Sequence, residues 1–422
     1  MSFFKKDDLI AGLNYVNLIS ALLLVASLPV YYSKLQYWSL NVFFITYIIE
    51  LFIEKKWKSV TWDKSKWVFI VMIIYFMLQF LYYPFEGNYA LFNKILEQRL
   101  SFIGFSIVGI FGFNKFYKIR YFAYMFILCS FVIICYLIFN KIGFKNFILS
   151  KDKEHLFGQT RIKYVHGHMI FNSFLNVALI FVFYLTSIIK KYPFSMIINP
   201  LALLMGGVIY SILFFSDGRT GFVVANCLLL MMIFYKLWNW KKKLAVVITM
   251  GAIVGMIFII FSHPRINEKS LDKEPRFAIW NVAINVIKEK PIFGYGASSA
   301  ADVFMEKGSQ DKKFQESGDV FLLKMMQKRD IQGGNPHDVF LKSLMDYGIF
   351  GLFIMLSIFI LPVLYANNQL RFTVFLLIFS VVFQLIFEIF PTGVSPIMFC
   401  LLLALFLSPP KERRKETTLI EG

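Results

Sequence analysis

Long apolar stretches follow one another along most of this chain, and short polar segments separate them. The stretches are continuous and have no alternating polar face, which predicts helices and not the strands of a barrel. A helix needs about 20 apolar residues to cross a bilayer core, and against that length the sequence predicts about twelve spanning helices. They lie near residues 9–32, 36–53, 67–83, 99–113, 121–140, 169–189, 197–215, 221–235, 244–261, 348–365, 372–390 and 394–408.

One polar stretch, from Ser262 to His337, interrupts this pattern late in the chain. A connection of that length is usually functional or disordered. Apolar residues recur at spacings of three and four between Arg276 and Glu289, which predicts an amphipathic helix and therefore order. The chain divides into spanning helices 1–9 over residues 1–261, an exterior loop over 262–337, spanning helices 10–12 over 338–408 and a basic tail over 409–422.

Composition agrees with a protein that lies in a membrane. Hydrophobic residues make up 58% of the sequence, which has 50 Phe, and the mean hydropathy is +0.63. An ordinary soluble domain is about 45–50% apolar. We therefore predict an all-α, polytopic membrane protein. The four cysteines fall in predicted spans, and they indicate packing and no disulfide framework.

The distribution of Lys and Arg predicts the orientation, because positive residues in short loops stay on the cytoplasmic side. With the N terminus inside, the cytoplasmic segments hold roughly twice as many of these residues as the short exterior connections. This bias predicts that both termini are cytoplasmic. We assign the net charge of +18 to basic loops that meet anionic lipid headgroups, and we find no nucleic-acid signature.

The predicted topology brings three polar elements to the exterior side. The first is the turn Ser216–Gly221, in which Arg219 either extends to the lipid headgroups or takes part in chemistry. The second begins at Arg276 and Trp280 and continues to the segment 291–296, which contains two glycines. Trp280 fits an interfacial anchor, but that interpretation leaves Arg276, on the same helix face, without a purpose.

The third element is the sequence Asn335-Pro336-His337-Asp338. Asn335 is a favourable helix N-cap and Pro336 suits the first helical position, which predicts that His337 lies in the first turn. The positive end of the helix dipole disfavours an imidazolium there, and a neutral imidazole can act as a general base. Asp338 could interact with the dipole or reach back to the Asn335 amide. Alone, His337 also fits a structural residue of the cap.

Other polar residues have structural alternatives too. His166 and His168 have no nearby third ligand, so a structural or substrate-lining role fits them better than a metal site. Glu388 lies near the exterior end of its span, where it could orient an exterior arginine or reach the interface. Gly348 and Gly351 are interpreted as residues that allow close helix packing.

Taken in order, these motifs resemble the O-antigen ligase family, whose relatives include repeat-unit polymerases and protein O-oligosaccharyltransferases. The resemblance rests on His337-Asp338 followed after nine residues by Gly348-x-x-Gly351, on the Arg219 turn, and on Arg276-x-x-x-Trp280 leading to Pro291-x-x-Gly294-x-Gly296. One departure is Asp338, since the family usually has Asn, Ser or Gln after the histidine. The resemblance implies a GT-C-like fold in the bacterial cytoplasmic (inner) membrane with a periplasmic active site.

The implied reaction transfers a glycan from a polyprenyl-diphosphate carrier, such as undecaprenyl diphosphate, to an acceptor hydroxyl. Negative charge grows on the leaving diphosphate and needs either a metal ion or arginines. The sequence has no compact acidic pair at an exterior span end, so we expect no metal and no cofactor. His337 is then the expected base and Arg219 and Arg276 the expected diphosphate clamp, with additional candidates at Arg161, Lys163 and Arg99 and supporting roles for Asp338, Trp280 and Glu388.

Several functions stay open at this stage. Within the enzyme class we favour ligation of O-antigen to the lipid A core of lipopolysaccharide, over polymerisation onto a growing glycan. None of Arg161, Arg219, Arg265 and Arg276 is followed ten residues later by the Gly of the polymerase pattern. The competing class is a transporter or flippase of the lipid-linked sugar. That class predicts related halves and broken helices near the midplane, and the sequence has neither.

Overall fold

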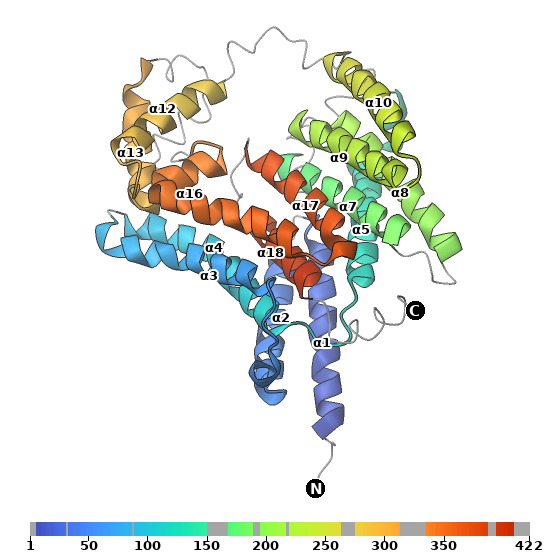
Figure 1. Cartoon of the computed structure of the whole chain (residues 1–422), viewed down its shortest axis with the longest axis horizontal. Coiled ribbons are helices and arrows are strands. Elements are labelled where there is room, and N and C mark those ends of the chain that lie inside the picture. The colour runs from blue at the N-terminus through green and yellow to red at the C-terminus, as the bar shows by residue number, and fades with distance from the viewer. Residues whose placement is uncertain are drawn as a thin grey trace.

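The computed structural model describes residues 6–30, 33–86, 88–149, 168–188, 195–216, 219–262, 275–312, 335–386 and 394–408. Throughout these ranges the regular structure is helical, and none of the described residues forms a strand. Figure 1 shows the helices packed against one another. The predicted all-α class is confirmed.

The helices follow the apolar runs closely. Their bounds are α1 (Lys6–Ser27), α2 (Ser33–Ile53), α3 (Lys66–Tyr82), α4 (Tyr89–Phe111), α5 (Ile119–Tyr136) with a π-helical continuation (Leu137–Ile142), α6 (Phe144–Leu149), α7 (His168–Ile188), α8 (Ser195–Phe215), α9 (Arg219–Trp238), α10 (Lys242–Ser262), α12 (Pro275–Glu289), α13 (Ala297–Gln310), α16 (Val339–Tyr365), α17 (Asn368–Leu385) and α18 (Val394–Leu407).

Every predicted apolar run coincides with one of these helices. Within the described ranges, seven helices are long and apolar enough to cross a membrane: those in α1, α2, α5, α7, α9, α16 and α17. Shorter apolar helices lie at Lys66–Tyr82, Pro200–Phe215 and Ser395–Leu407. The multi-pass prediction is therefore confirmed, whereas the count of about twelve spans stays a prediction.

Helix α7 lies at the centre of one half of the molecule. It packs against α5, α8, α9 and α17, and from Phe171 to Leu185 most of its side chains are buried. A helix that is apolar on all sides is buried on all sides, and the run from Val177 to Leu185 has that composition. The other half is built from α3 and α4, which pack on each other and on α16 and α18 respectively.

The helices α12 and α13 come from the polar stretch of the sequence. They pack on each other and on α16, and Figure 1 shows them on the side of the molecule opposite the N terminus. The buried side chains Ile279, Ala283 and Val286 recur at three and four residues along α12. The predicted amphipathic helix between Arg276 and Glu289 is confirmed.

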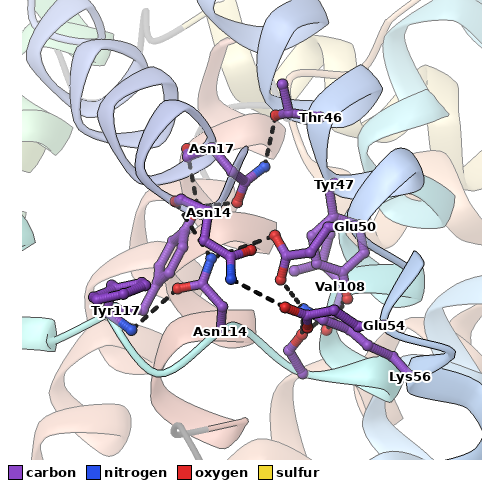
Figure 2. A network of polar contacts seen from close by, with 12 residues as sticks. Asn14, Asn17, Thr46, Tyr47, Glu50, Glu54, Lys56, Val108, Asn114 and Tyr117 are labelled. Carbon is purple, nitrogen blue, oxygen red and sulfur yellow. Dashed lines mark hydrogen bonds and ion pairs between the residues drawn. The ribbon is translucent and has the colours of Figure 1, made fainter. Parts of the chain in front are cut away.

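A buried polar network joins α1, α2 and the connection between α4 and α5 (Figure 2). Its centre is Glu50, which is fully buried, forms an ion pair with Lys56 and accepts a hydrogen bond of 3.3 Å from Asn114. Asn17 accepts from the hydroxyl of Tyr117. We call this set the N-terminal network.

Helix α16 folds back on itself at Gly348. The ring centroids of Phe340 and Phe359 are 6.0 Å apart, although a straight helix would separate positions 340 and 359 by roughly 28 Å. Gly348 has φ +62° and ψ −156°, a conformation that is essentially restricted to glycine. The segment 339–347, which we call the arm, therefore lies against the longer segment 349–365.

The turn at Gly348 pairs with the segment 291–296, and we call this contact the junction. The Tyr295 amide donates to the Met345 carbonyl at 3.0 Å, the Gly296 amide to the Asp346 carbonyl at 2.8 Å and the Ile349 amide to the Pro291 carbonyl at 3.0 Å. A Cβ on Gly348 would overlap the Ile292 carbonyl, and one on Gly294 would lie 2.6 Å from the Asp346 carbonyl. The glycines permit backbone contact between two distant segments, which extends the predicted role of Gly348 in close packing.

Candidate active site

His337 stands just before the arm and not in its first turn. The helix begins at Val339 with Asp338 as the N-cap, so the predicted start at Asn335 and Pro336 is wrong by about one turn. The reason is local: the Asn335 side chain accepts from the His337 amide at 3.0 Å, which closes a turn before the helix begins. His337 has φ +53° and is partly exposed.

Asp338 caps the arm directly. Its carboxylate accepts from the amides of Phe340 and Leu341, each at 2.8 Å. Its carboxylate is directed forward to the arm as an N-cap, and it does not make the contact with the Asn335 amide that one sequence interpretation suggested. Burial raises the pKa of the Asp338 carboxyl, and the two amide hydrogen bonds oppose that rise.

Arg276 lies in the first turn of α12 and is half-buried. Positions 276, 279, 283 and 286 recur at helical spacing, so Arg276 extends the buried stripe of α12 toward its N-terminal end. Trp280 is half-buried and forms an edge-to-face contact with Phe277, with ring centroids 5.8 Å apart. Helix α12 packs on α16, and the C-terminal ends of α12 and of the arm both lead into the junction.

Arg219 is the first residue of α9, and its side chain lies outside the described residues. The backbone around it is fixed against α7. The Ser216 hydroxyl donates to Asn172 at 2.9 Å, the Asn176 amide donates to the Gly221 carbonyl at 3.1 Å, and a Cβ on Gly221 would overlap Asn172. The start of α9, which carries Arg219, is therefore held against α7.

Arg99 lies in a buried ionic contact with the arm. Its guanidinium is 3.2 Å from Asp346 Oδ2 and donates to the Tyr347 hydroxyl at 2.6 Å. It also lies over the rings of Tyr75 and Tyr347, 5.4 and 5.7 Å from their centroids. Lys342 Nζ is 2.6 Å from Asp346 Oδ1. We call Arg99, Lys342 and Asp346 the ion cluster.

The remaining candidates cannot be placed. Arg161, Lys163, His166 and Glu388 lie outside the described residues, and so does the His168 side chain. Their predicted roles stay predictions.

Sequence reasoning missed two residues of the ion cluster, Lys342 and Asp346, and also Glu86. A signal for the cluster was present, because Asp338, Lys342 and Asp346 follow one another at four-residue spacing and share a helix face. Glu86 gave no such signal. It accepts hydrogen bonds from the amides of Ser298 and Ser299 at the start of α13, more than 200 residues away along the chain.

Two comparisons with known proteins bear on this site. Residues 200–356 match the family model described as O-antigen ligase, and this range holds Arg219, Arg276 and His337. A protein of Haemophilus influenzae described as an uncharacterized protein is 29% identical over 112 residues. That match covers 26% of this chain and 25% of the relative, so the chain aligns with about a quarter of that protein. The family resemblance found in the sequence motifs is confirmed.

Proposed function

The chain belongs to the O-antigen ligase family through residues 200–356, and on that premise we propose that it transfers a glycan from a polyprenyl-diphosphate carrier to an acceptor hydroxyl. A glycosyltransferase of the O-antigen ligase type is the general function that the family supports. Its partners are in general a lipid-linked glycan and a lipid acceptor. The identities of the donor glycan and of the acceptor, together with the mechanism, are what we propose beyond this general function.

One observation carries the proposal: three candidate residues from different parts of the chain stand at the N-terminal ends of helices. Arg219 begins α9, Arg276 lies in the first turn of α12, and His337 directly precedes the cap of α16. Helix N-termini carry partial positive charge, which favours phosphate at the two ends that bear arginines, whereas the end of α16 is already capped by the Asp338 carboxylate. Two guanidinium groups on such ends suit a diphosphate leaving group.

The backbone of His337 adds support. Among the described residues outside glycine, only Lys55 and His337 have positive φ. A non-glycine residue in that region is strained, and such strain is found at functional sites when neighbouring contacts maintain it. The hydrogen bond from the His337 amide to Asn335 and the cap at Asp338 are such contacts.

In the proposed reaction His337 accepts the proton of the acceptor hydroxyl while its oxygen forms a bond to the anomeric carbon. The bond from that carbon to the diphosphate breaks, and the electron pair leaves with the diphosphate. Arg219 and Arg276 neutralise the charge that develops there. Attack opposite the leaving group inverts the anomeric configuration, and this scheme needs no metal ion.

We favour ligation of O-antigen to the lipid A core, with the protein in the cytoplasmic membrane of a bacterium, both termini in the cytoplasm and the site facing the periplasm. Repeat-unit polymerisation and transfer to protein are the alternatives within the family. Analysis of a deletion strain separates them. Accumulated lipid-linked polymer together with uncapped lipid A core indicates a ligase, and loss of polymer length indicates a polymerase.

The test of the mechanism uses purified protein in nanodiscs with an undecaprenyl-diphosphate glycan and lipid A core as acceptor. We expect release of undecaprenyl diphosphate in the presence of EDTA, and losses of at least about 100-fold for His337→Ala and Arg276→Ala, since general bases and charge-stabilising donors contribute on that order. Arg371→Ala, which removes an arginine at the start of α17, is the matched control. Full activity of both site variants would refute the assignment, and dependence on added metal would refute the arginine clamp. Movement of the donor without a new glycosidic bond would favour a transporter.

A further inference from the structure

We infer that the ion cluster of Arg99, Lys342 and Asp346 is a positioning device that holds the arm and thereby fixes His337. The inference rests on the proposed role of His337 as the base. It assigns to Arg99 a contact with the arm, where the sequence suggested a contact with the diphosphate.

The cluster joins three elements, the arm, α4 and α13, through Asp346 and Lys342. Asp346 uses both oxygens, one for Lys342 and one for Arg99 of α4. Lys342 Nζ also donates to the Ala297 carbonyl at the start of α13, at 3.1 Å. The side chain of Asp346 has no exposed surface, and those of Arg99 and Lys342 are 15% and 13% exposed. The arm is therefore connected to α4 and to α13 at the same point.

The orientation of Arg99 is fixed from its other side by two tyrosines. The Tyr347 hydroxyl accepts from Arg99 Nη1 at 2.6 Å, and the ring centroid of Tyr75 lies 5.4 Å from the guanidinium carbon. Guanidinium groups bind aromatic faces and carboxylates in defined planes. Arg99 therefore donates to Asp346 in one defined orientation.

Stability alone does not explain such a cluster. Buried ion pairs are often replaceable by packed apolar residues without loss of stability, because removing charge from water is costly. This cluster holds two cations for one anion, which raises that cost further. What it supplies is the register of the arm, since a shift of the arm by one residue would turn Asp346 away from Arg99 and Lys342 away from the Ala297 carbonyl.

The position of the arm also determines where His337 lies. From Asp346 to Asp338 it runs eight positions, roughly 12 Å of helix, and the Asp338 cap leads directly to His337. The junction fixes the same end of the arm through Gly296 and Tyr295. Release of Asp346 would leave the backbone turn intact but allow the distant end, which carries His337, to move.

The test compares Asp346→Asn with Glu50→Gln, a buried carboxylate of the N-terminal network that is also paired with a lysine. Misplacement of a catalytic group by about 1 Å costs on the order of 100-fold in rate. We expect Asp346→Asn to lower kcat by about 10- to 100-fold with little change in KM for the donor. Glu50→Gln should leave both constants unchanged per folded molecule.

A second readout reports the arm without any activity. Cysteines at Phe340 and Phe359, in a variant whose four native cysteines are alanine, should cross-link with a short bis-maleimide. The expected yield is high with Asp346 present and reduced in Asp346→Asn. Unchanged kcat or unchanged cross-linking in Asp346→Asn would overturn the inference.

If Asp346→Asn does not accumulate in the membrane, Arg99→Met takes its place, because it removes the contact between the arm and α4 and leaves the Lys342–Asp346 pair of the arm neutral. The same reductions are expected, and unchanged values would overturn the inference equally. An active His337→Ala variant would refute the proposed base, while the cross-linking result would still decide whether the cluster holds the arm.

Discussion

The ion cluster and the N-terminal network are two buried ionic contacts built from similar groups. Asp346 and Glu50 each have a fully buried carboxylate that pairs with a lysine nearby in sequence. Tyrosine rings lie beside the cation in both, since Lys56 lies over Tyr47 with a distance of 4.9 Å to its centroid. The two carboxylates differ in the element that carries them. Glu50 is near the end of a long helix, and Asp346 is in a short arm beside a turn.

Their partners differ in a second way. Around Glu50 lies a second carboxylate, Glu54, which accepts from Asn14 at 3.0 Å, and Lys56 also donates to the Gly112 carbonyl, which accepts from Tyr47 as well. Figure 2 shows Tyr47, Glu50, Glu54 and Lys56 close together beside Val108. The ion cluster instead has an excess cation. The comparison teaches that the same ionic chemistry can fasten long helices together in one region and, in our proposal, set the register of a short arm in another.

The largest expected effect comes from the turn that makes the arm possible. Gly348→Ala adds a Cβ where it would overlap the Ile292 carbonyl, and the backbone conformation alone costs a non-glycine residue about 1–3 kcal/mol. We expect a folded yield far below that of the wild type and no activity, because the junction must separate. Gly251→Ala in α10, whose added Cβ meets nothing within 4 Å, is the control. Fluorescence-detected size-exclusion chromatography measures the folded yield of both variants. A wild-type yield for Gly348→Ala would show that the arm does not depend on this turn.

The next effect tests whether the N-terminal network is only structural. Glu50→Gln leaves the Lys56 cation buried without its anion, and removal of one partner of a buried pair costs about 3–5 kcal/mol. Thermal unfolding in detergent should show this loss. The double variant with Lys56→Met should recover part of it. A fall in activity per folded molecule would remove the contrast with Asp346.

Much of the fold could be predicted because it depends on apolar runs. The twelve predicted apolar runs are helices, and the apolar stripe between Arg276 and Glu289 lies in α12. Both features depend on the local sequence and on the exclusion of polar groups from apolar surroundings. The start of α16 was predicted wrongly because two residues, Asn335 and Asp338, both suit a cap. Which of the two residues is the N-cap depends on the path of the chain before the helix.

The candidate site could be predicted only in part, because its geometry depends on contacts between distant segments. Gly294 and Gly348 were recognised as a motif, but the sequence does not reveal that one backbone lies against the other. Arg99 was noticed for its charge, whereas its partner Asp346 lies 247 positions away. The convergence of His337, Arg219 and Arg276 stays a prediction.

A smaller effect is expected at the other end of the arm. The raised pKa of Asp338 means that its carboxylate is less favourable in the folded protein than in the unfolded chain. Its contribution to stability therefore falls as pH rises from the unfolded value through the folded pKa. Asp338→Asn keeps an oxygen for the two amides and removes this titration, and Asp338→Ala loses the cap, at about 1 kcal/mol. Unfolding measured from pH 4 to pH 8 should give a flatter profile for Asn than for the wild type, and identical profiles would contradict this.

The smallest effect is expected where an ionic contact is exposed. Glu289 forms an ion pair with Lys307 and accepts from the Tyr295 hydroxyl at 2.7 Å. The hydrogen bonds from Lys307 and Tyr295 lower the pKa of Glu289, and burial together with Glu289 raises the pKa of Tyr295 to about 12. The contribution of Glu289 is thus present above its unfolded pKa and is lost as pH falls through the lowered value. Water and salt screen an exposed pair, so Glu289→Gln should change the unfolding midpoint less than any variant above. A loss as large as that of Glu50→Gln would mean that ionic contact, and not burial, determines what these residues contribute.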